Sequence, residues 1–363
     1  MRHLATVQRI DALEPIPDRD QIVLATVLGW RVIVRKADYN VGDQCVYIEI
    51  DSVLPEKPEF EFLRSKNFRI KTMKMAGVIS QGICFPMSVL PAGQYILGQD
   101  VTQILGVKQY EPDMDDPVGE GGASKASRKD SAKLNRFPKF LCKYAWFRRL
   151  VLGKKKEEGF PSFISKTDET RIQSAPWYLE DKEPYVWTEK VDGTSGTFAL
   201  VKHKRLFGIK YEYIVCSRNR RLPVNDGSVY WQVSEKYKLK EKLMNLIANN
   251  DWIAIQGECL GPKIQKNKYK VAGPQFYAFN LITQGVRASS TKAKGILSCY
   301  DIDFVPIVYE KKQLPATVDE MIAAAHGPSA INPETLREGL VCRSLDGRKS
   351  FKAVDPEFLL KYD

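Results

Sequence analysis

The sequence holds few of the residues that build metal centres or disulfide frameworks. It has seven cysteines, an odd number, and no two of them have the CxxC spacing of zinc and redox motifs. It has three histidines, too few for a histidine-rich metal centre. It also lacks an apolar leader and any apolar run of about 18 residues. We therefore expect a soluble, intracellular protein of a reducing compartment, with no membrane partner.

Positive charge is in excess. Lys and Arg number 55 against 44 Asp and Glu, which gives a net charge of +11 and a pI near 9.1. Such a surface favours a polyanionic partner, nucleic acid before membrane, although solubility alone is the plainer interpretation. The length of 363 residues exceeds one ordinary core, so two or three domains are expected.

Residues 1–105 are rich in predicted strands. Short apolar stretches separated by turn residues cover 4–10, 22–28, 30–35, 45–50, 70–75 and 78–85. Five or six short strands in about a hundred residues are typical of a small barrel, and an OB fold fits best. Basic residues from Arg31 to Lys74 would line a groove for phosphates. Phe60, Phe62 and Phe68 either stack on bases there or belong to the core.

Residues 106–160 are predicted to be a linker that becomes a basic segment. Residues 111–120 hold five acids, and residues 121–156 hold twelve Lys or Arg with one acid. This segment either binds RNA phosphates or is a solvated connector, and the sequence does not separate the two.

Residues 161–363 alternate between predicted strands and helices. Strands are expected over 186–201, 205–216, 252–255, 275–282, 339–343 and 350–354. Ser228 would cap a helix running to about residue 250. Thr317 and Glu320 have capping-box spacing before a helix that ends near Ala325. This pattern predicts an α+β domain built on antiparallel sheet.

A lysine stands at the mouth of a predicted turn within 189–193, Glu-Lys-Val-Asp-Gly. Lysine is a nucleophile only as the neutral amine, and an ordinary lysine titrates near 10.4. Nearby cations, above all a bound metal ion, favour the neutral form. The plainer interpretation of Lys190 is a surface lysine beside a turn aspartate.

Other charged residues also stand at or within predicted strands. Glu258 follows an apolar strand, Glu338 precedes another, and Lys352 lies within a third. With Lys190 and Asp192 they form a set suited to ATP: lysines for the phosphates, carboxylates for hydrated Mg²⁺ and a ribose hydroxyl.

Six segments then follow one another in the order of a known superfamily. The chain resembles the covalent nucleotidyltransferases, and among them the ATP-dependent RNA ligases, over 189–193, 216–219, 256–261, 276–280, 338–341 and 350–353. Residues 166–173 resemble a segment ahead of the nucleophile in ligases with an N-terminal OB domain. The resemblance implies such a domain followed by an antiparallel-sheet nucleotidyltransferase domain over 161–363.

The chain departs from the superfamily pattern at three places, and two of them bear on which kind of enzyme it resembles. Ser195 stands where DNA ligases and capping enzymes usually carry arginine, and only 11 residues follow Lys352, too few for a C-terminal OB domain. Both departures favour an RNA ligase. Many members also place two lysines one residue apart in the last motif. Here Ser350 takes the second position and Lys349 lies three residues before Lys352.

The resemblance also implies roles for individual residues. Lys190, with Asp192 and Lys352, would perform catalysis, and Asp192, Glu258 and Glu338 would hold Mg²⁺ or Mn²⁺, partly through water. The implied ATP contacts are Glu189 at the adenine amine, Phe279 stacked on adenine, Glu258 at the ribose, Lys352 at the α-phosphate, and Arg218 at the AMP phosphate or the 3′-OH end. Further candidates for binding the nucleotide are Glu338, Arg171, Gln173 and Lys349.

The implied activity is the sealing of 3′-OH and 5′-phosphate RNA ends, in duplex nicks during RNA repair, through a lysyl-adenylate. The expected partner is RNA or an RNA-containing nicked duplex, bound by a monomer. Two alternatives remain at this point: a capping-type guanylyltransferase, or a non-catalytic RNA-binding OB protein.

Overall fold

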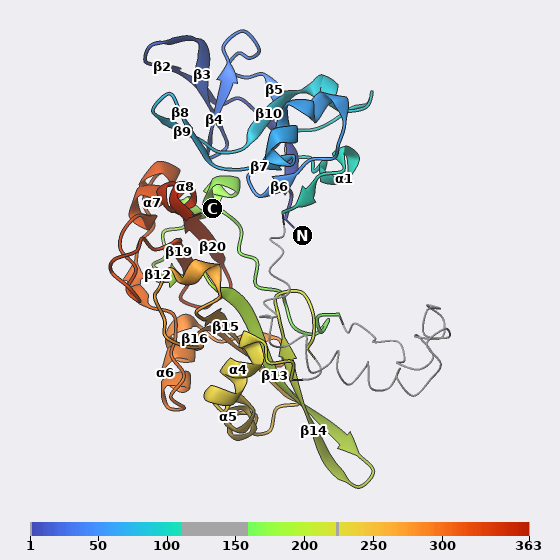
Figure 1. Cartoon of the computed structure of the whole chain (residues 1–363), viewed down its shortest axis with the longest axis vertical. Helices are drawn as coiled ribbons and strands as arrows, with labels where there is room; N and C mark the ends of the chain where they lie inside the picture. Colours follow the sequence, from blue (N-terminus) through green and yellow to red (C-terminus); the bar gives the residue numbers. More distant parts are fainter. Residues whose placement is uncertain (1, 111–158, 223–224, 363) are drawn as a thin grey trace, which may run out of the picture.

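The structure is a computed structural model that describes residues 2–110, 159–222 and 225–362. Figure 1 shows an N-terminal β-domain above a larger C-terminal α+β domain, as predicted. The basic segment expected within 106–160 falls almost entirely outside the described residues. None of the helices in the described ranges is long and apolar enough to cross a membrane.

The N-terminal domain is a small barrel of antiparallel sheets. One sheet has the order β1-β5-β10 and another the order β2-β3-β4, with smaller pairings at their ends. The strands are β1 Ala5–Arg9, β2 Ala12–Ile16, β3 Arg19–Val27, β4 Trp30–Arg35, β5 Gln44–Ile48, β6 Ser52–Val53, β7 Arg69–Ile70, β8 Met73–Met75, β9 Val78–Ser80, β10 Ile83–Pro86 and β11 Lys108–Gln109. Its short helices are η1 Pro58–Lys66, η2 Met87–Val89 and α1 Thr102–Leu105.

The aromatic residues expected near a barrel groove divide between core and surface. Phe60 and Phe68 are buried in the barrel core, whereas Phe62 is 59% exposed. Arg64 is held by Glu61 in the same short helix. The stacking role proposed for all three rings is therefore open only to Phe62.

The C-terminal domain contains two antiparallel sheets. A five-stranded sheet has the order β14-β13-β15-β16-β17, and a four-stranded sheet has the order β18-β12-β19-β20. The strands are β12 Tyr185–Lys190, β13 Thr194–Arg205, β14 Gly208–Cys216, β15 Trp252–Leu260, β16 Gln275–Thr283, β17 Val286–Arg287, β18 Ile307–Lys312, β19 Gly339–Ser344 and β20 Ser350–Val354. Strand β18 was not predicted, and β15 is longer than expected.

Helices pack against these sheets. They are α4 Val229–Lys236, α5 Leu239–Leu246, α6 Ser290–Ser298, α7 Val318–Ala325 and α8 Pro356–Tyr362, with η4 Ile172–Ser174, η5 Pro176–Glu180 and η6 Gln265–Asn267. The single helix expected after Ser228 is two helices, because Lys238 adopts a left-handed conformation between them. The predicted capping box at Thr317 and Glu320 is present in both directions.

The turn at 191–193 carries the chain from one sheet to the other. Strand β12 belongs to the four-stranded sheet and β13 to the five-stranded sheet, so they do not form the hairpin that a tight turn suggests. Gly193 is required here, because a Cβ would lie 2.6 Å from the Cys259 carbonyl oxygen and 2.5 Å from Leu260. The residues around this crossing therefore face the space between two sheets.

Polar contacts join the barrel to the C-terminal domain. The Gly29 amide donates to the Gln173 carbonyl at 3.0 Å, and the Trp30 indole donates to Ser174 at 3.2 Å. Arg171 donates to the Asp51 carboxylate at 2.8 Å. These contacts place the segment 166–174, which leads into the C-terminal domain, directly against the barrel.

Candidate functional site

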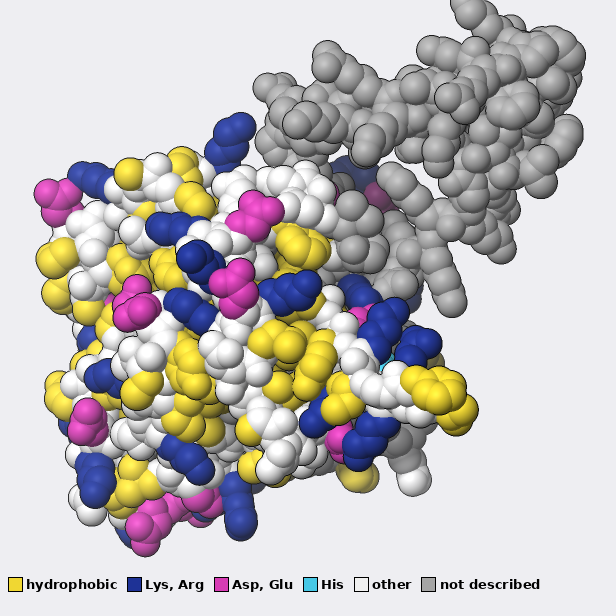
Figure 2. All heavy atoms as spheres, turned by 90° about the horizontal axis from the view of Figure 1, so that it is seen from below, with side chains coloured by type: hydrophobic (Ala, Val, Ile, Leu, Met, Phe, Trp, Pro, Cys, Tyr) yellow, Lys and Arg dark blue, Asp and Glu magenta, His cyan; other side chains and the backbone are white. Residues whose placement is uncertain are grey.

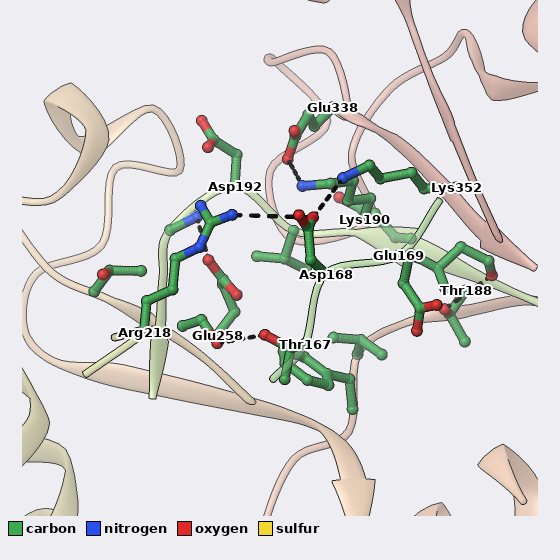
Figure 3. Close-up of a pocket in the computed structure, with 18 of the residues that line it drawn as sticks. Thr167, Asp168, Glu169, Thr188, Lys190, Asp192, Arg218, Glu258, Glu338 and Lys352 are labelled. Carbon is green, nitrogen blue, oxygen red and sulfur yellow. Dashed lines mark hydrogen bonds and ion pairs between the residues drawn. The ribbon is translucent and has the colours of Figure 1, made fainter. Parts of the chain in front are cut away.

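A cavity of about 270 Å³ opens where the two sheets of the C-terminal domain meet. Its walls come from β12, β13, β15, β16, β19 and β20, and from the segment 167–169. Eight of the eleven predicted site residues line it: Glu189, Lys190, Asp192, Arg218, Glu258, Phe279, Glu338 and Lys352. Figure 3 shows Lys190 pointing toward Glu338, and Lys352 and Arg218 pointing toward Asp168.

Lys190 ends β12 and reaches into the cavity. Its ammonium donates to Glu338 Oε2 at 2.5 Å, and both side chains are partly shielded from solvent. The residue after Glu338 is Gly339, which packs closely against β20. A Cβ at Gly339 would lie 2.1 Å from the Ala353 carbonyl oxygen, so this close packing needs glycine and fixes the backbone beside Glu338. In this state the lysine is ion-paired, so it must lose this partner before it can act as a nucleophile.

Two more carboxylates flank the lysine. Glu258, on β15, accepts the Gly193 amide at 3.1 Å. Burial raises the pKa of Glu258 to about 7, with Lys190 acting in the opposite direction. Asp192 forms an ion pair with Lys268, and its amide donates to the Tyr269 hydroxyl at 2.9 Å. The carboxylates are thus fixed around Lys190 by main-chain and side-chain partners.

Lys352 lies on β20 of the same four-stranded sheet as Lys190, two strands away. Its ammonium donates to Asp168 at 3.0 Å, and Arg218 lies 3.9 Å from the same carboxylate. Burial lowers the pKa of Lys352 to about 8, although Asp168 acts to raise it. Arg218 is half exposed and lies in the loop after β14, which belongs to the five-stranded sheet. Two cations, one from each sheet, therefore face the cavity around one acid, a set suited to binding phosphate.

A β-bulge positions Phe279. In the pairing of β15 with β16, Gln256 lies opposite Asn280 but Gly257 lies opposite Ala278, so Phe279 has no paired partner. Such a bulge re-aims a side chain, and the Phe279 ring lines the cavity. Arg343 donates to the Phe279 carbonyl at 2.6 Å and fixes the bulge from the neighbouring sheet.

Glu189 lines the cavity, but its carboxylate is already engaged. Ser329 donates to one oxygen at 2.5 Å and the Ala330 amide to the other at 2.8 Å. The side chain thereby anchors the loop at 329–330 beside β12. An adenine amine would have to use a remaining lone pair of this carboxylate.

Three predicted residues lie outside the cavity. Arg171 is buried against Asp51 of the barrel, and Gln173 is buried with its carbonyl bound to Gly29. Lys349 is an exposed residue whose ammonium donates to Asp181 at 2.6 Å. The structure thus leaves these three residues out of the cavity that the other eight predicted residues line. Arg171 and Gln173 contact the barrel and Lys349 contacts Asp181, so a contact of any of the three with a nucleotide stays a prediction.

Several residues that line the cavity, or bind a residue that does, were not singled out from the sequence. Asp168 binds Lys352, Lys268 binds Asp192, and Glu169 binds Ser350 and Arg343. Asp168 and Glu169 fall in the 166–173 segment, which gave a signal as a whole but not for these residues. Lys268 lies in an irregular loop with no motif, so only the folded structure reveals it.

Over the described residues, no three His, Cys, Asp or Glu side chains are placed to ligate a metal directly. Asp192, Glu258 and Glu338 instead line one cavity with Lys190, and Glu338 binds the Lys190 ammonium. Mg²⁺ commonly keeps several water ligands and uses few protein oxygens. The donor set therefore fits a hydrated divalent ion held through water.

Family models match both domains. An RNA ligase family model matches residues 183–362, and an OB-fold domain model matches residues 4–87. The chain belongs to the RNA ligases. Its expected architecture, an OB domain followed by an antiparallel-sheet nucleotidyltransferase domain, is confirmed, as is the ATP-dependent RNA ligase family. The capping enzyme and the non-catalytic OB protein are set aside.

Solved structures of one RNA ligase resemble the whole chain. The Naegleria gruberi RNA ligase with pyrophosphate shares 29% identity and a TM-score of 0.80, over 100% of this chain and 99% of that one. A variant of it with AMP and Mn gives 28% identity, a TM-score of 0.78 and 99% coverage of both chains. A variant of the same ligase with ATP and Mn shares 29% identity and a TM-score of 0.78, again over 99% of both chains. No curated protein sequence matches the chain.

Proposed function

We propose that this ligase seals 3′-OH and 5′-phosphate RNA ends in nicked duplexes, acting as a monomer through a lysyl-adenylate on Lys190. The observation that carries the proposal is the position of Lys190 at the wall of a cavity that is also lined by carboxylates and by the cations Lys352 and Arg218. ATP and a divalent metal are its cofactors, since the similar RNA ligase has been solved with ATP, AMP and Mn.

In the first step the Lys190 amine attacks the α-phosphorus of ATP. A P–N bond forms, the bond to the β-phosphate oxygen breaks, and pyrophosphate leaves as the amine loses a proton. Lys352 and Arg218, which line the same cavity, would neutralise charge on the phosphoryl oxygens. Glu258 would accept a hydrogen bond from a ribose hydroxyl, and Phe279 would stack on adenine. Together these contacts would hold the α-phosphorus in line with the Lys190 amine.

A hydrated divalent ion beside Asp192, Glu258 and Glu338 would stabilise the charged phosphate and favour the neutral amine. This chain would contribute the carboxylates that bind the water ligands of the ion. Glu338 now binds the lysine ammonium, and Lys268 balances Asp192. Binding of the cation would displace the Lys190–Glu338 pair and so free the amine.

In the second step an oxygen of the RNA 5′-phosphate attacks the AMP phosphorus and Lys190 leaves. In the third, the 3′-OH attacks the 5′-phosphorus and AMP departs as the phosphodiester forms. A groove of about 1010 Å³ runs between the two domains and shares Asp168, Arg218 and Asn219 with the cavity. Its position supports an RNA path that uses both domains, as expected of a nick-sealing enzyme.

The test is sealing of matched substrates with RNA or DNA on either side of the break. The expected result is faster sealing of a nick in a duplex than of single strands, with RNA required on the 3′-OH side. Lys190→Ala is the inactive control. Equal or better sealing of single-stranded ends would contradict the nick-sealing assignment.

A further inference from the structure

Strands β13 and β14 continue beyond the sheet as an isolated two-stranded ribbon. The pairing of β13 with β15 ends at Val201 and Trp252, whereas β13 and β14 stay paired to Arg205 and Gly208. Figure 1 shows this ribbon projecting from the end of the molecule opposite the barrel. Every residue from 204 to 211 is exposed, and Asp251 of the neighbouring loop lies 3.7 Å from Lys204 at the base of the ribbon.

The ribbon ends in two large apolar side chains that the turn does not require. Leu206 is 93% exposed and Phe207 is 95% exposed. Two-residue hairpin turns favour Asn, Asp and Gly, which provide the backbone conformations that such turns need. Leu206 and Phe207 therefore do not stabilise the turn, and their exposure to water is unfavourable. Exposed apolar side chains of this kind indicate that a partner buries them.

The chemistry beside this tip is basic. Residues 202–211 hold four Lys or Arg and no acid. Directly paired residues share a face, so Lys202 and Lys204 lie with Tyr211 and Ile209, while Arg205, His203 and Lys210 lie on the other face. Figure 2, seen from this end, shows a projecting apolar tip bordered by Lys and Arg side chains. Lysine on a free strand edge also prevents aggregation, but exposed Leu and Phe would promote it.

The two strands of the ribbon connect it directly to the cavity. Strand β13 begins with Thr194 and Ser195, which line the cavity, and β14 leads into Arg218, which also lines it. From Thr197 to the tip, nine residue steps of about 3.3 Å give a reach of about 30 Å. An A-form RNA duplex rises about 2.8 Å per base pair, so this reach equals roughly eleven base pairs. A partner at the tip would thus be continuous with an RNA bound at the cavity.

We propose that the β13–β14 ribbon, residues 202–211, is a second RNA contact that grips one duplex arm of the substrate, well away from the break. The cations bind phosphates, and Leu206 and Phe207 lie against the sugars and base edges of the wide, shallow minor groove of duplex RNA. This inference rests on the proposed function, because it takes a nicked duplex as the substrate.

The test measures the affinity of the full chain for a nick that cannot be sealed, made with a 3′-deoxy end and followed by fluorescence anisotropy. The tip variant combines Leu206→Ser with Phe207→Asn, polar residues suited to this turn, in which Gly208 and not residue 206 or 207 has a positive φ, so the ribbon stays folded. The charge variant combines Lys204→Gln, Arg205→Gln and Lys210→Gln. Each duplex arm is made about 6 or about 16 base pairs long, shorter and longer than the ribbon's reach.

With long arms, the tip variant should bind roughly ten-fold more weakly than the unmodified chain, as expected for losing apolar contacts with one or two nucleotides. With one arm shortened, the two proteins should bind equally. The charge variant should lower the slope of log affinity against log salt by about 3, for three lost phosphate contacts at about 0.9 each on a duplex. Controls are Val286→Asn, an exposed apolar residue elsewhere, and Lys292→Gln with Lys294→Gln on α6.

Wild-type affinity in the tip variant with long arms would overturn the proposal and point to a protein partner for the ribbon. An equal loss with short arms would also overturn it, since the ribbon would then act at the break. Failure of the unmodified chain to form a lysyl-adenylate or to seal nicks would instead refute the proposed function. Binding to the nick that cannot be sealed is measured separately from lysyl-adenylate formation and from sealing, so the two failures can be told apart.

Discussion

Replacing Asp51 by asparagine tests how the OB domain is held on the catalytic domain. Asp51 accepts from Arg171 across the interface at 2.8 Å and also lies 3.5 Å from Arg2. Burial acts to raise its pKa, but Arg171 and Arg2 outweigh that effect and hold it at about 2, against an ordinary 3.8. At 1.36 kcal/mol per unit, this shift corresponds to about 2 kcal/mol of stability at neutral pH.

A second estimate comes from the buried partner. Arg171 is almost fully buried, and removing one member of a buried ion pair costs about 3–5 kcal/mol. Asp51 is one quarter exposed, and asparagine still offers an oxygen to Arg171, so the smaller value is the better guide. Asp51→Asn should therefore lower the melting temperature by roughly 4–8 °C at pH 7.

The assay is thermal unfolding followed by circular dichroism, with Asp38→Asn as the control. Asp38 is an exposed aspartate of the same domain and should change stability by less than about 0.5 kcal/mol. Because the folded pKa is depressed, the difference between Asp51→Asn and the unmodified chain should persist above pH 4 and vanish toward pH 2. An unchanged melting temperature at pH 7 would refute the reasoning.

Further predictions concern the nucleotide cavity. ATP affinity, measured without divalent metal, should rise with pH through about 7 as Glu258 ionises, and Glu258→Gln should remove that rise. Self-adenylylation should fall above pH 8 as Lys352 loses its proton, and Lys352→Arg, which does not titrate there, should extend activity to higher pH. An alkaline limb unchanged in Lys352→Arg would contradict this role. Phe279→Ala should raise the KM for ATP roughly ten-fold while Phe279→Tyr stays near wild type, as expected for a stacking contact.

Much of the cavity could be predicted because its residues stand at the ends of recognisable strands. Lys190 closes β12, Glu258 lies near the end of β15, and Glu338 immediately precedes β19. The order of these segments along the chain carried the assignment, since each segment alone is short. The barrel was predictable for a similar reason, because its strands are brief and separated by turn residues.

What could not be predicted depends on contacts between distant segments. The crossing at 191–193 looks like a hairpin turn, but pairing with β19 on one side and β15 on the other separates β12 and β13 into two sheets. The bulge at Phe279 is invisible in the sequence because it arises from register with β15. Arg171 was placed near the nucleotide, and its carboxylate partner, Asp51, lies 120 residues away in the other domain.

The central claim is that Lys190 carries the nucleotide. Incubating the protein with α-³²P-labelled ATP and a divalent metal, then denaturing it, shows directly whether the label is covalently attached. The unmodified chain and Lys349→Ala, whose lysine lies outside the cavity, should both be labelled, and Lys190→Ala should not. Covalent labelling of Lys190→Ala at the level of the unmodified chain would contradict the account.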